Sequence, residues 1–174
     1  MKKITLSLLA ISFFMFIFCS CDVVKPAVPD CVFTSNATVK TQDSKYNIEV
    51  NSGVDGCIKI KVLKPTPVSG LTYTYAKDTL YIEYLKLRCN APVDYLRRGA
   101  FADVIYRALS FEKEQPLRTK TSDRETTTYI VESGDSQILL SCDTKTGVIQ
   151  KIEDTTTNVI VEFSAVEKEE KPSA

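Results

Sequence analysis

The chain has 174 residues with 22 basic and 22 acidic side chains, and it contains no histidine. The absence of histidine excludes serine or cysteine catalysis with a histidine base, and it excludes zinc sites with histidine ligands. The sequence also lacks the glycine-rich loops that bind nucleotide phosphates, so we expect no enzyme activity, no cofactor and no metal site.

The first twenty residues have the pattern of a signal peptide. A basic Met-Lys-Lys start precedes an uncharged apolar run from Ile4 to Phe18, which is shorter than the roughly 20 residues of a membrane-spanning helix. The run is followed by Ser20 and Cys21, and a small residue before a cysteine resembles the lipobox of bacterial lipoproteins. We expect cleavage after residue 20 and a lipid on Cys21. Ordinary secretion and an uncleaved anchor are the alternatives.

A lipid on Cys21 determines where the protein works. Cys19 is the less suitable acceptor, because the bulky Phe18 would then stand beside the cleavage site. Two acyl chains of the palmitate type on Cys21 would hold the protein stably, whereas one chain binds only marginally. We expect an extracytoplasmic protein anchored to the cell membrane. Losing the lysines at positions 2 and 3 leaves 20 basic and 22 acidic side chains, so nucleic acid is not an expected partner.

The mature chain divides into three parts. Residues 21–30 contain the lipidated cysteine and two prolines, and they are predicted to be a short tether. Residues 31–166 are long enough for one β-rich domain with its own core. Residues 167–174 are charged and are predicted to be a disordered tail.

Within residues 31–166 the main apolar period is two, which predicts β-strands. Apolar and polar residues alternate from Tyr46 to Val50 and from Ile58 to Val62, with a glycine-bounded turn between the two segments. We expect a hairpin that puts all the apolar residues on one face. Its register pairs Val50 with Ile58, Ile48 with Ile60 and Tyr46 with Val62.

Two more hairpins are predicted in the same way, at residues 71–84 and 126–143, with turns at Lys77-Asp78 and Gly134-Asp135. A slip of one residue would reverse every face, so the consistent apolar faces support these registers. Further strands are expected from Cys31 and at residues 148–153 and 159–163. The expected opposite pairs are Leu71 with Tyr84, Tyr73 with Ile82, Tyr75 with Leu80, Tyr129 with Leu140 and Val131 with Ile138.

Residues 93–111 have helical spacing instead. Asn90 is the expected N-cap, and Pro92 is expected in the first turn. A single amphipathic helix between two groups of strands predicts an α+β fold in which the helix covers one face of an antiparallel sheet. The apolar residues at helical spacing are Leu96, Phe101, Val104, Ile105, Ala108 and Leu109.

Three segments carry a family resemblance: Pro65–Tyr73 with the pattern Pro-x-x-x-x-Gly-Leu-x-Tyr, the turn Asp143–Gly147, and the apolar strand Val159–Phe163. Together with the order of elements, they resemble small LolA-like lipoproteins of Gram-positive bacteria over residues 31–165. The resemblance implies a strongly curved antiparallel sheet, an incomplete barrel of nine or ten strands whose mouth is plugged by helix. It also implies that a lipid or part of a lipoprotein is carried between sheet and helix.

One set of apolar residues shares a face of the 71–84 hairpin. These side chains would either line an apolar ligand cavity or fill an ordinary core. On the predicted helix, Arg97 and Arg98 would either form the solvated face or bind an anion. The candidate cavity residues are Leu71, Tyr73, Tyr75, Leu80, Ile82 and Tyr84.

Four further cysteines lie in the exported domain, at positions 31, 57, 89 and 142. Four cysteines allow three pairings. The predicted hairpin sets Cys57 opposite Asn51, at the end of the sheet where the strand from Cys31 would also lie. We expect disulfides between Cys31 and Cys57 and between Cys89 and Cys142. Four reduced thiols are the alternative.

Two functions of different classes are consistent with the sequence. The first is a membrane-anchored protein that binds an apolar ligand, a lipid or part of another lipoprotein, between sheet and helix. The second is a non-catalytic structural or complex-forming lipoprotein of the cell envelope whose interior is solid. The expected partners are the membrane, through the anchor, and a lipid or another envelope protein.

Overall fold

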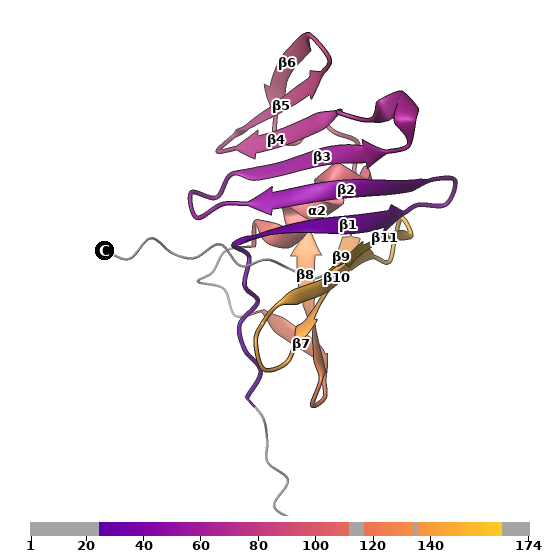
Figure 1. Ribbon diagram of the computed structural model, residues 1–174. Coiled ribbons are helices and arrows are strands. Elements are labelled where there is room, and N and C mark those ends of the chain that lie inside the picture. The colour runs from indigo at the N-terminus through magenta and orange to yellow at the C-terminus, as the bar shows by residue number, and fades with distance from the viewer. Residues whose placement is uncertain (1–24, 112–116, 134–135, 165–174) are drawn as a thin grey trace, which may run out of the picture.

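The computed structural model describes residues 25–111, 117–133 and 136–164 (Figure 1). Over these residues the chain forms one antiparallel sheet of eleven strands, in the order β6-β5-β4-β3-β2-β1-β11-β10-β9-β8-β7, and a single α-helix, α2 (Phe101–Leu109). A short 3-10 helix (Thr66–Val68) joins β3 to β4. The strands are β1 (Phe33–Lys40), β2 (Lys45–Ser52), β3 (Ile58–Lys64), β4 (Thr72–Ala76), β5 (Thr79–Tyr84), β6 (Leu87–Pro92), β7 (Arg118–Ser122), β8 (Thr126–Ser133), β9 (Ser136–Asp143), β10 (Ile149–Asp154) and β11 (Val159–Phe163).

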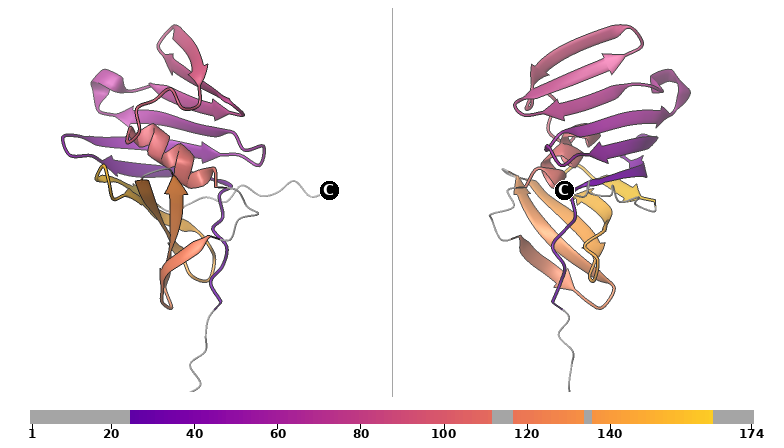
Figure 2. Two further views of the ribbon diagram at one scale, coloured as in Figure 1. Left: turned by 180° about the vertical axis from the view of Figure 1, so that it is seen from behind. Right: turned by 60° about the vertical axis from the view of Figure 1, so that its left-hand side comes forward.

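The sheet is strongly curved and does not close, because β6 and β7 are its two ends. Helix α2 lies across the concave face, as the view from behind shows (Figure 2). The predicted α+β architecture, a curved antiparallel sheet covered by one helix, is therefore confirmed. The strand number exceeds the nine or ten expected, since β6 and β7 were not predicted. Nearly all of their residues are exposed, so neither strand has an apolar alternation to reveal it.

The core lies on the concave face. Direct pairing places Val50 opposite Ile60 and Ile152 opposite Leu140, so apolar side chains of successive strands form one continuous surface. All four of these side chains are fully buried. No helix in the described part of the chain is long and apolar enough to cross a membrane. The predicted signal peptide and Cys21 lie outside the described residues.

The later two hairpins have the predicted registers. Tyr73 lies opposite Ile82 and Tyr75 opposite Leu80, and in the second hairpin Tyr129 lies opposite Leu140 and Val131 opposite Ile138. The ladder between β4 and β5 ends at Thr72 and Glu83, so it does not include the expected pair of Leu71 and Tyr84. The turn expected at residues 134–135 lies outside the described residues.

The register predicted for the first hairpin is wrong by two residues. Val50 lies opposite Ile60 instead of Ile58, and Ser52 takes the position opposite Ile58. Five residues, 53–57, lie between the paired Ser52 and Ile58, and the Gly53 N–H donates to the Cys57 carbonyl at 2.9 Å across this loop. A shift of two residues preserves the faces, since strand side chains alternate with a period of two. The apolar residues therefore still share one surface.

The predicted start of the helix is also wrong. Asn90 lies in β6 opposite Tyr81, and the helix begins only after Ala100, which makes no side-chain cap. Gly99 has a φ of 86°, and a Cβ at this position would lie 2.4 Å from the Thr157 methyl group. Because only glycine fits this backbone and this close approach, the chain turns here and the helix cannot extend upstream.

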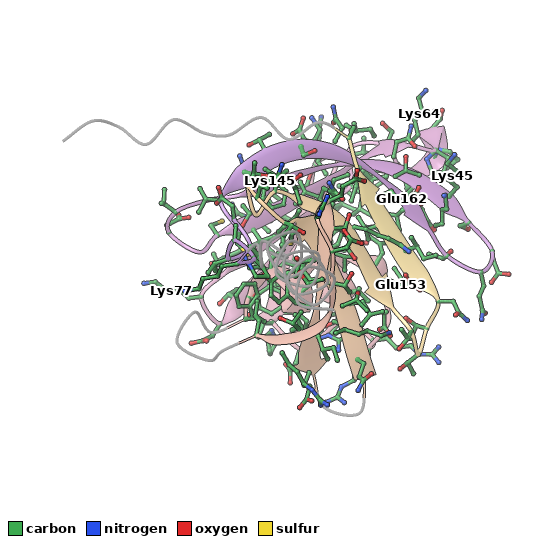
Figure 3. All side chains as sticks on the ribbon, turned by 90° about the horizontal axis from the view of Figure 1, so that it is seen from below. Lys45, Lys64, Lys77, Lys145, Glu153 and Glu162 are labelled. Carbon is green, nitrogen blue, oxygen red and sulfur yellow. The ribbon has the colours of Figure 1, made fainter. Side chains whose placement is uncertain are left out.

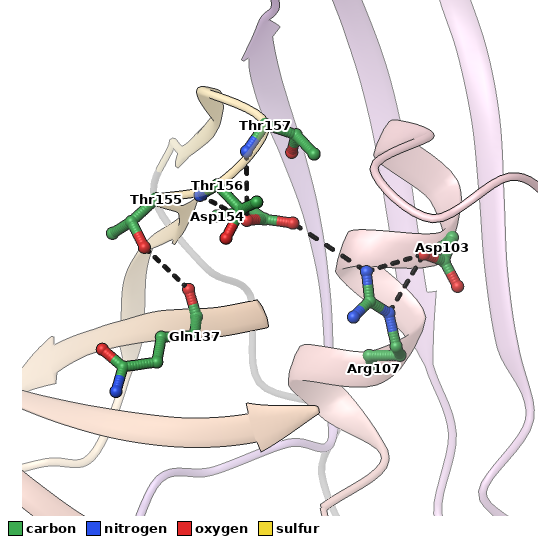
Figure 4. Close-up of polar contacts among 7 residues, drawn as sticks. All are labelled: Asp103, Arg107, Gln137, Asp154, Thr155, Thr156 and Thr157. Carbon is green, nitrogen blue, oxygen red and sulfur yellow. Dashed lines mark hydrogen bonds and ion pairs between the residues drawn. The ribbon is translucent and has the colours of Figure 1, made fainter. Parts of the chain in front are cut away.

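A buried ionic network attaches α2 to the sheet (Figure 4). The Arg107 guanidinium contacts the Asp103 carboxylate at 2.7 Å, and its Nη2 lies 3.9 Å from Oδ2 of Asp154. The side chains of Arg107 and Asp103 are 14% and 7% exposed, and that of Asp154 is wholly buried. The other Asp154 oxygen accepts the N–H groups of Thr156 and Thr157 in the turn after β10. The network therefore connects the helix to the β10–β11 turn.

We predict that Arg107→Ala lowers the free energy of unfolding by about 3 to 5 kcal/mol, because it leaves two buried carboxylates without a compensating charge. Urea denaturation of the purified protein measures this. Arg118→Ala is the matched control, since Arg118 and Glu132 form an exposed pair with 3.9 Å between their charged atoms. We expect little change from the control. Equal effects of the two substitutions would contradict a structural role for the buried network.

Candidate functional site

The six candidate cavity residues do not share one environment. Tyr75 and Leu80 are 1% and 0% exposed and belong to the closed core. Leu71, Tyr73 and Ile82 are only half-buried and pack against the edge of that core. The sixth residue, Tyr84, is half-buried and donates its hydroxyl to the Pro67 carbonyl at 2.6 Å. The face predicted from the sequence is therefore divided into a closed part and a partly open part.

An aromatic cluster lies at the partly open part. The Phe101 ring, at the start of α2, is 5.1 Å from the Tyr46 ring and 5.8 Å from the Tyr73 ring, measured between centroids. All three side chains are half-buried. Tyr46 and Phe101 were not among the predicted site residues. The sequence showed that each of them belongs to an apolar repeat. It did not show that Phe101 contacts Tyr46 and Tyr73, because these residues lie on α2, β2 and β4, which only the fold brings together.

The partly buried segment before the helix completes this region. Val93 and Leu96 lie between β6 and α2, and both pack against the core without being enclosed by it. The chain from Pro92 to Phe101 runs along the concave side of the sheet from β6 to the helix (Figure 2). We call the half-buried set of Tyr46, Leu71, Tyr73, Ile82, Val93, Leu96 and Phe101 the open apolar face.

The contact beneath α2 itself is closed. Val104, Ile105 and Ala108 have no exposed surface, and the Tyr106 ring stacks on the Tyr75 ring with 4.2 Å between centroids. Burial, reinforced by the Asp103 carboxylate, raises the pKa of Tyr75 well above its usual range. Its buried hydroxyl has no hydrogen-bond partner among the described residues. This part of the interface is packed like an ordinary core.

A polar hollow of about 450 Å³ lies at the N-terminal end of α2. It is lined by Arg97, Arg98 and Ala100 from the segment that leads into the helix, and by residues 41–43 of the β1–β2 turn and Thr157. Neither arginine makes an ion pair with any described residue, although Asp43 also lines the hollow. Ala100, which lines this hollow, is the residue immediately before Phe101 of the aromatic cluster.

A second hollow, of about 360 Å³, lies at the other end of the helix. It is bounded by the β2–β3 turn and by the end of α2, with Val54, Tyr106 and Phe111 among its apolar residues. Val54 is 70% exposed. Lys77 and Asp55 also line this hollow, so its wall is mixed in character. The two hollows thus flank the packed helix.

The cysteines do not form the predicted disulfides, because Cys57, Cys89 and Cys142 are all thiols. Cys89 is exposed on β6 and Cys142 is buried on β9, near opposite ends of the sheet order, so the fold separates them. Burial raises the pKa of the Cys142 thiol to about 12, with smaller contributions from Cys31 and Asp143. Such a thiol carries almost no thiolate near neutral pH and is a poor nucleophile.

Part of the predicted tether is docked on the domain. The Ala27 N–H donates to the Thr144 carbonyl at 2.9 Å, and the Ala27 carbonyl accepts the Tyr129 hydroxyl at 2.9 Å. The Asp30 N–H donates to the Gly147 carbonyl, and Pro29 is buried. Residues 27–30, which were predicted to belong to the tether, are therefore hydrogen-bonded to the domain. These contacts are mostly from backbone atoms, so the apolar pattern of the sequence did not indicate them.

No group of histidine, cysteine or acidic side chains in the described part of the chain could hold a metal ion. The Asp143 carboxylate accepts the backbone N–H groups of Lys145 and Thr146 and the Thr146 hydroxyl. These bonds, led by those from Thr146, lower the pKa of Asp143. The carboxylate therefore stabilises the β9–β10 turn. The partly open, apolar and aromatic surface is the most distinctive feature of the concave side.

The likeness of this chain to known proteins is a likeness of fold. No protein-family model matches the sequence, and no curated protein matches it either. Among solved structures, the chain is similar to a LolA superfamily protein from Nitrosomonas europaea, with 13% identity and a TM-score of 0.49 over 80% of this chain and 87% of that chain. It is also similar to an uncharacterized conserved protein from Thermus thermophilus, with 11% identity and a TM-score of 0.50 over 80% of each chain.

A third similar structure is MucB of Pseudomonas aeruginosa, solved in complex with MucA. It has 14% identity and a TM-score of 0.45, over 81% of this chain and 53% of that one. At these identities the likeness concerns the fold alone. The Gram-positive source suggested by the sequence resemblance stays a prediction. Any statement about function therefore rests on the residues of this chain.

Proposed function

We propose that this chain is a non-catalytic, membrane-anchored extracytoplasmic lipoprotein that binds an apolar ligand on the concave side of its sheet. The ligand class is a lipid or the acyl part of a lipoprotein. The open apolar face supports this proposal more than any other feature, because its side chains lie next to the core yet remain partly exposed. Apolar surfaces that a folded protein leaves incompletely covered commonly mark ligand or partner sites.

The position of this face defines where the ligand binds. The packed contact under α2 leaves no opening between Tyr75 and Tyr106, whose rings stack at 4.2 Å. The aromatic cluster of Tyr46, Tyr73 and Phe101 has half-exposed rings instead. We therefore place the ligand against β2, β4 and β5, beneath the segment 93–100, and not beneath the helix.

The neighbouring polar hollow is consistent with an amphiphile. Arg97 and Arg98 lie there without an ion pair to any described residue. Ala100 lines the same hollow and immediately precedes Phe101 of the aromatic cluster. A carboxylate or phosphate headgroup in the hollow would gain charge-assisted hydrogen bonds from the guanidinium groups. Its acyl chain would extend from there onto the open apolar face.

The alternative is a complex-forming envelope lipoprotein with a solid interior. The fully buried side chains of Val104, Ile105 and Ala108 favour it, because they show that the helix needs no ligand to complete its packing. On this alternative the open apolar face would contact another protein. Binding of isolated lipid by the purified protein distinguishes the two functions.

We predict that a fluorescent fatty acid binds the purified protein and that Tyr73→Ala raises its Kd by about tenfold, the loss expected for one aromatic contact of 1 to 1.5 kcal/mol. A fluorescence titration measures this. Tyr81→Ala is the matched control. Tyr81 is also half-buried and lies on the next strand, but its neighbours Leu80 and Ile82 place it on the opposite face. No uptake, or equal loss in both variants, would contradict the proposed site.

The anchor is tested separately. We predict that Cys21→Ser abolishes labelling of the protein by radioactive palmitate and either releases the protein into the medium or leaves it uncleaved, since serine has no thiol to accept the lipid. Cys19→Ser is the control and should leave the labelling intact. Unchanged labelling in Cys21→Ser cells would exclude Cys21 as the lipidated residue.

A further inference from the structure

The stretch of chain that follows the proposed anchor is fixed to one end of the sheet. Residues 27–30 lie along the β9–β10 turn, and Asp30 forms a parallel bridge with Val148. Three hydrogen bonds of 2.9 Å join this stretch to Thr144, Gly147 and Tyr129. We call the surface formed by residues 25–28, the β9–β10 turn and the β7–β8 turn the tether pole. The Thr144 N–H donates to the Glu125 carbonyl, so the two turns are themselves joined.

Gly147 makes this docking possible. Its φ is 71°, and a Cβ at this position would lie 2.2 Å from the Val28 carbonyl oxygen. The close approach therefore requires glycine for both its backbone conformation and its lack of a side chain. Asp143 holds the same turn in shape through its bonds to residues 145 and 146. The docked stretch therefore contacts a turn whose shape is fixed by hydrogen bonds.

The stretch of chain between Cys21 and Ala27 is short compared with the molecule. Six residue steps separate Cys21 from Ala27, and a fully extended chain spans at most about 22 Å over that length. By contrast, β10 and β6 are seven strand steps apart in the sheet. At about 4.8 Å for each step, this corresponds to roughly 34 Å before curvature is considered. Even when fully extended, the chain from Cys21 to Ala27 cannot reach from the tether pole to the β6 end.

The direction in which the chain leaves the domain leads to the same conclusion as its length. The described chain leaves the domain at the end opposite β6, in Figure 1 and in both views of Figure 2. Lys145 belongs to the β9–β10 turn and therefore to this pole, and Figure 3 looks onto the molecule from the tether side. At the other end, the β5–β6 hairpin projects with Leu85 and Leu87, which are 85% and 74% exposed.

We infer that the tether pole faces the lipid bilayer and that the β5–β6 hairpin points away from it. The orientation rests on the proposed lipid at Cys21, and the docked residues 27–30 add what the anchor alone does not supply. With a free linker of residues 22–30, the domain would rotate over the membrane. With residues 27–30 docked, the β9–β10 turn is held near the surface. The polar hollow and the open apolar face then lie above the tether pole, on the side of the domain.

The absence of tryptophan in the sequence permits a direct test. The full lipidated chain, with either Lys145→Trp or Leu85→Trp, is reconstituted into phosphatidylcholine–phosphatidylglycerol vesicles that contain a dansyl-headgroup lipid. Energy transfer from the introduced indole to the dansyl group reports its distance from the surface. We expect transfer to be several-fold greater for Lys145→Trp than for Leu85→Trp. Equal transfer, or greater transfer from Leu85→Trp, would overturn the orientation.

A second substitution tests the docking itself. Gly147→Ala should displace residues 27–30 and reduce the difference in transfer between the two tryptophan positions. Gly70→Ala is the matched control, because Gly70 has a similar φ of 88° but nothing lies within 4 Å of its Cβ position. The control should keep the full difference, and if both variants keep it, the docked stretch does not set the orientation. Thermal unfolding of each variant verifies that it is folded, and Tyr129→Phe provides a milder loss of docking.

Failure of the anchor and failure of the orientation are distinguishable. Palmitate labelling and flotation with the vesicles report the lipid at Cys21 independently of any indole. A chain without that lipid would overturn the proposed anchor and the orientation together. A lipidated chain with equal transfer from both positions would overturn the orientation alone.

Discussion

The concave face of the sheet holds most of the apolar side chains that the strands carry, and the positions of the helix and of the open apolar face follow from it. Residues such as Val50, Ile60 and Leu140 lie opposite apolar partners on neighbouring strands, so each strand adds to one continuous buried surface. Because this surface is on one side only, the sheet curves around it and needs a cover. A single nine-residue helix is the cover that the described residues provide.

One helix does not cover eleven strands equally. The network of Asp103, Arg107 and Asp154 holds α2 near the β10–β11 turn, where the packing is complete. Toward β4 and β5 the cover consists of the non-helical segment 93–100, which contains two turns, and the side chains below it are half-exposed. The same constraint that stabilises one part of the core therefore leaves the other part accessible. This unequal cover is the physical basis of the proposed ligand site.

Much of the fold was predictable because apolar alternation directly reports strands with one buried face. The hairpins at residues 71–84 and 126–143 have the expected pairs, and the error at Val50 changed the register without changing the face. Strands β6 and β7 were missed because edge strands that bury nothing have no such pattern. Asn90 and Pro92 have the residue types of a helix start, but pairing with β5 determines their structure.

The site was less predictable, for reasons of the same kind. Tyr73 and Tyr75 are equivalent in the sequence, and only the position of α2 makes one open and the other closed. Phe101 joins Tyr46 and Tyr73 across three elements, which no local pattern encodes. Docking of residues 27–30 depends on backbone hydrogen bonds and on the missing Cβ of Gly147. Contacts of this sort have no periodic signature.

The central claim is that the open apolar face is a ligand site and not a surface awaiting a protein partner. Native mass spectrometry of the protein, purified from its membrane without added lipid, tests it most directly. The account predicts a population whose mass exceeds that of the lipidated chain by one bound apolar molecule, released on unfolding. The account would be contradicted if the spectrum showed only the mass of the lipidated chain and the same preparations also failed to take up added lipid.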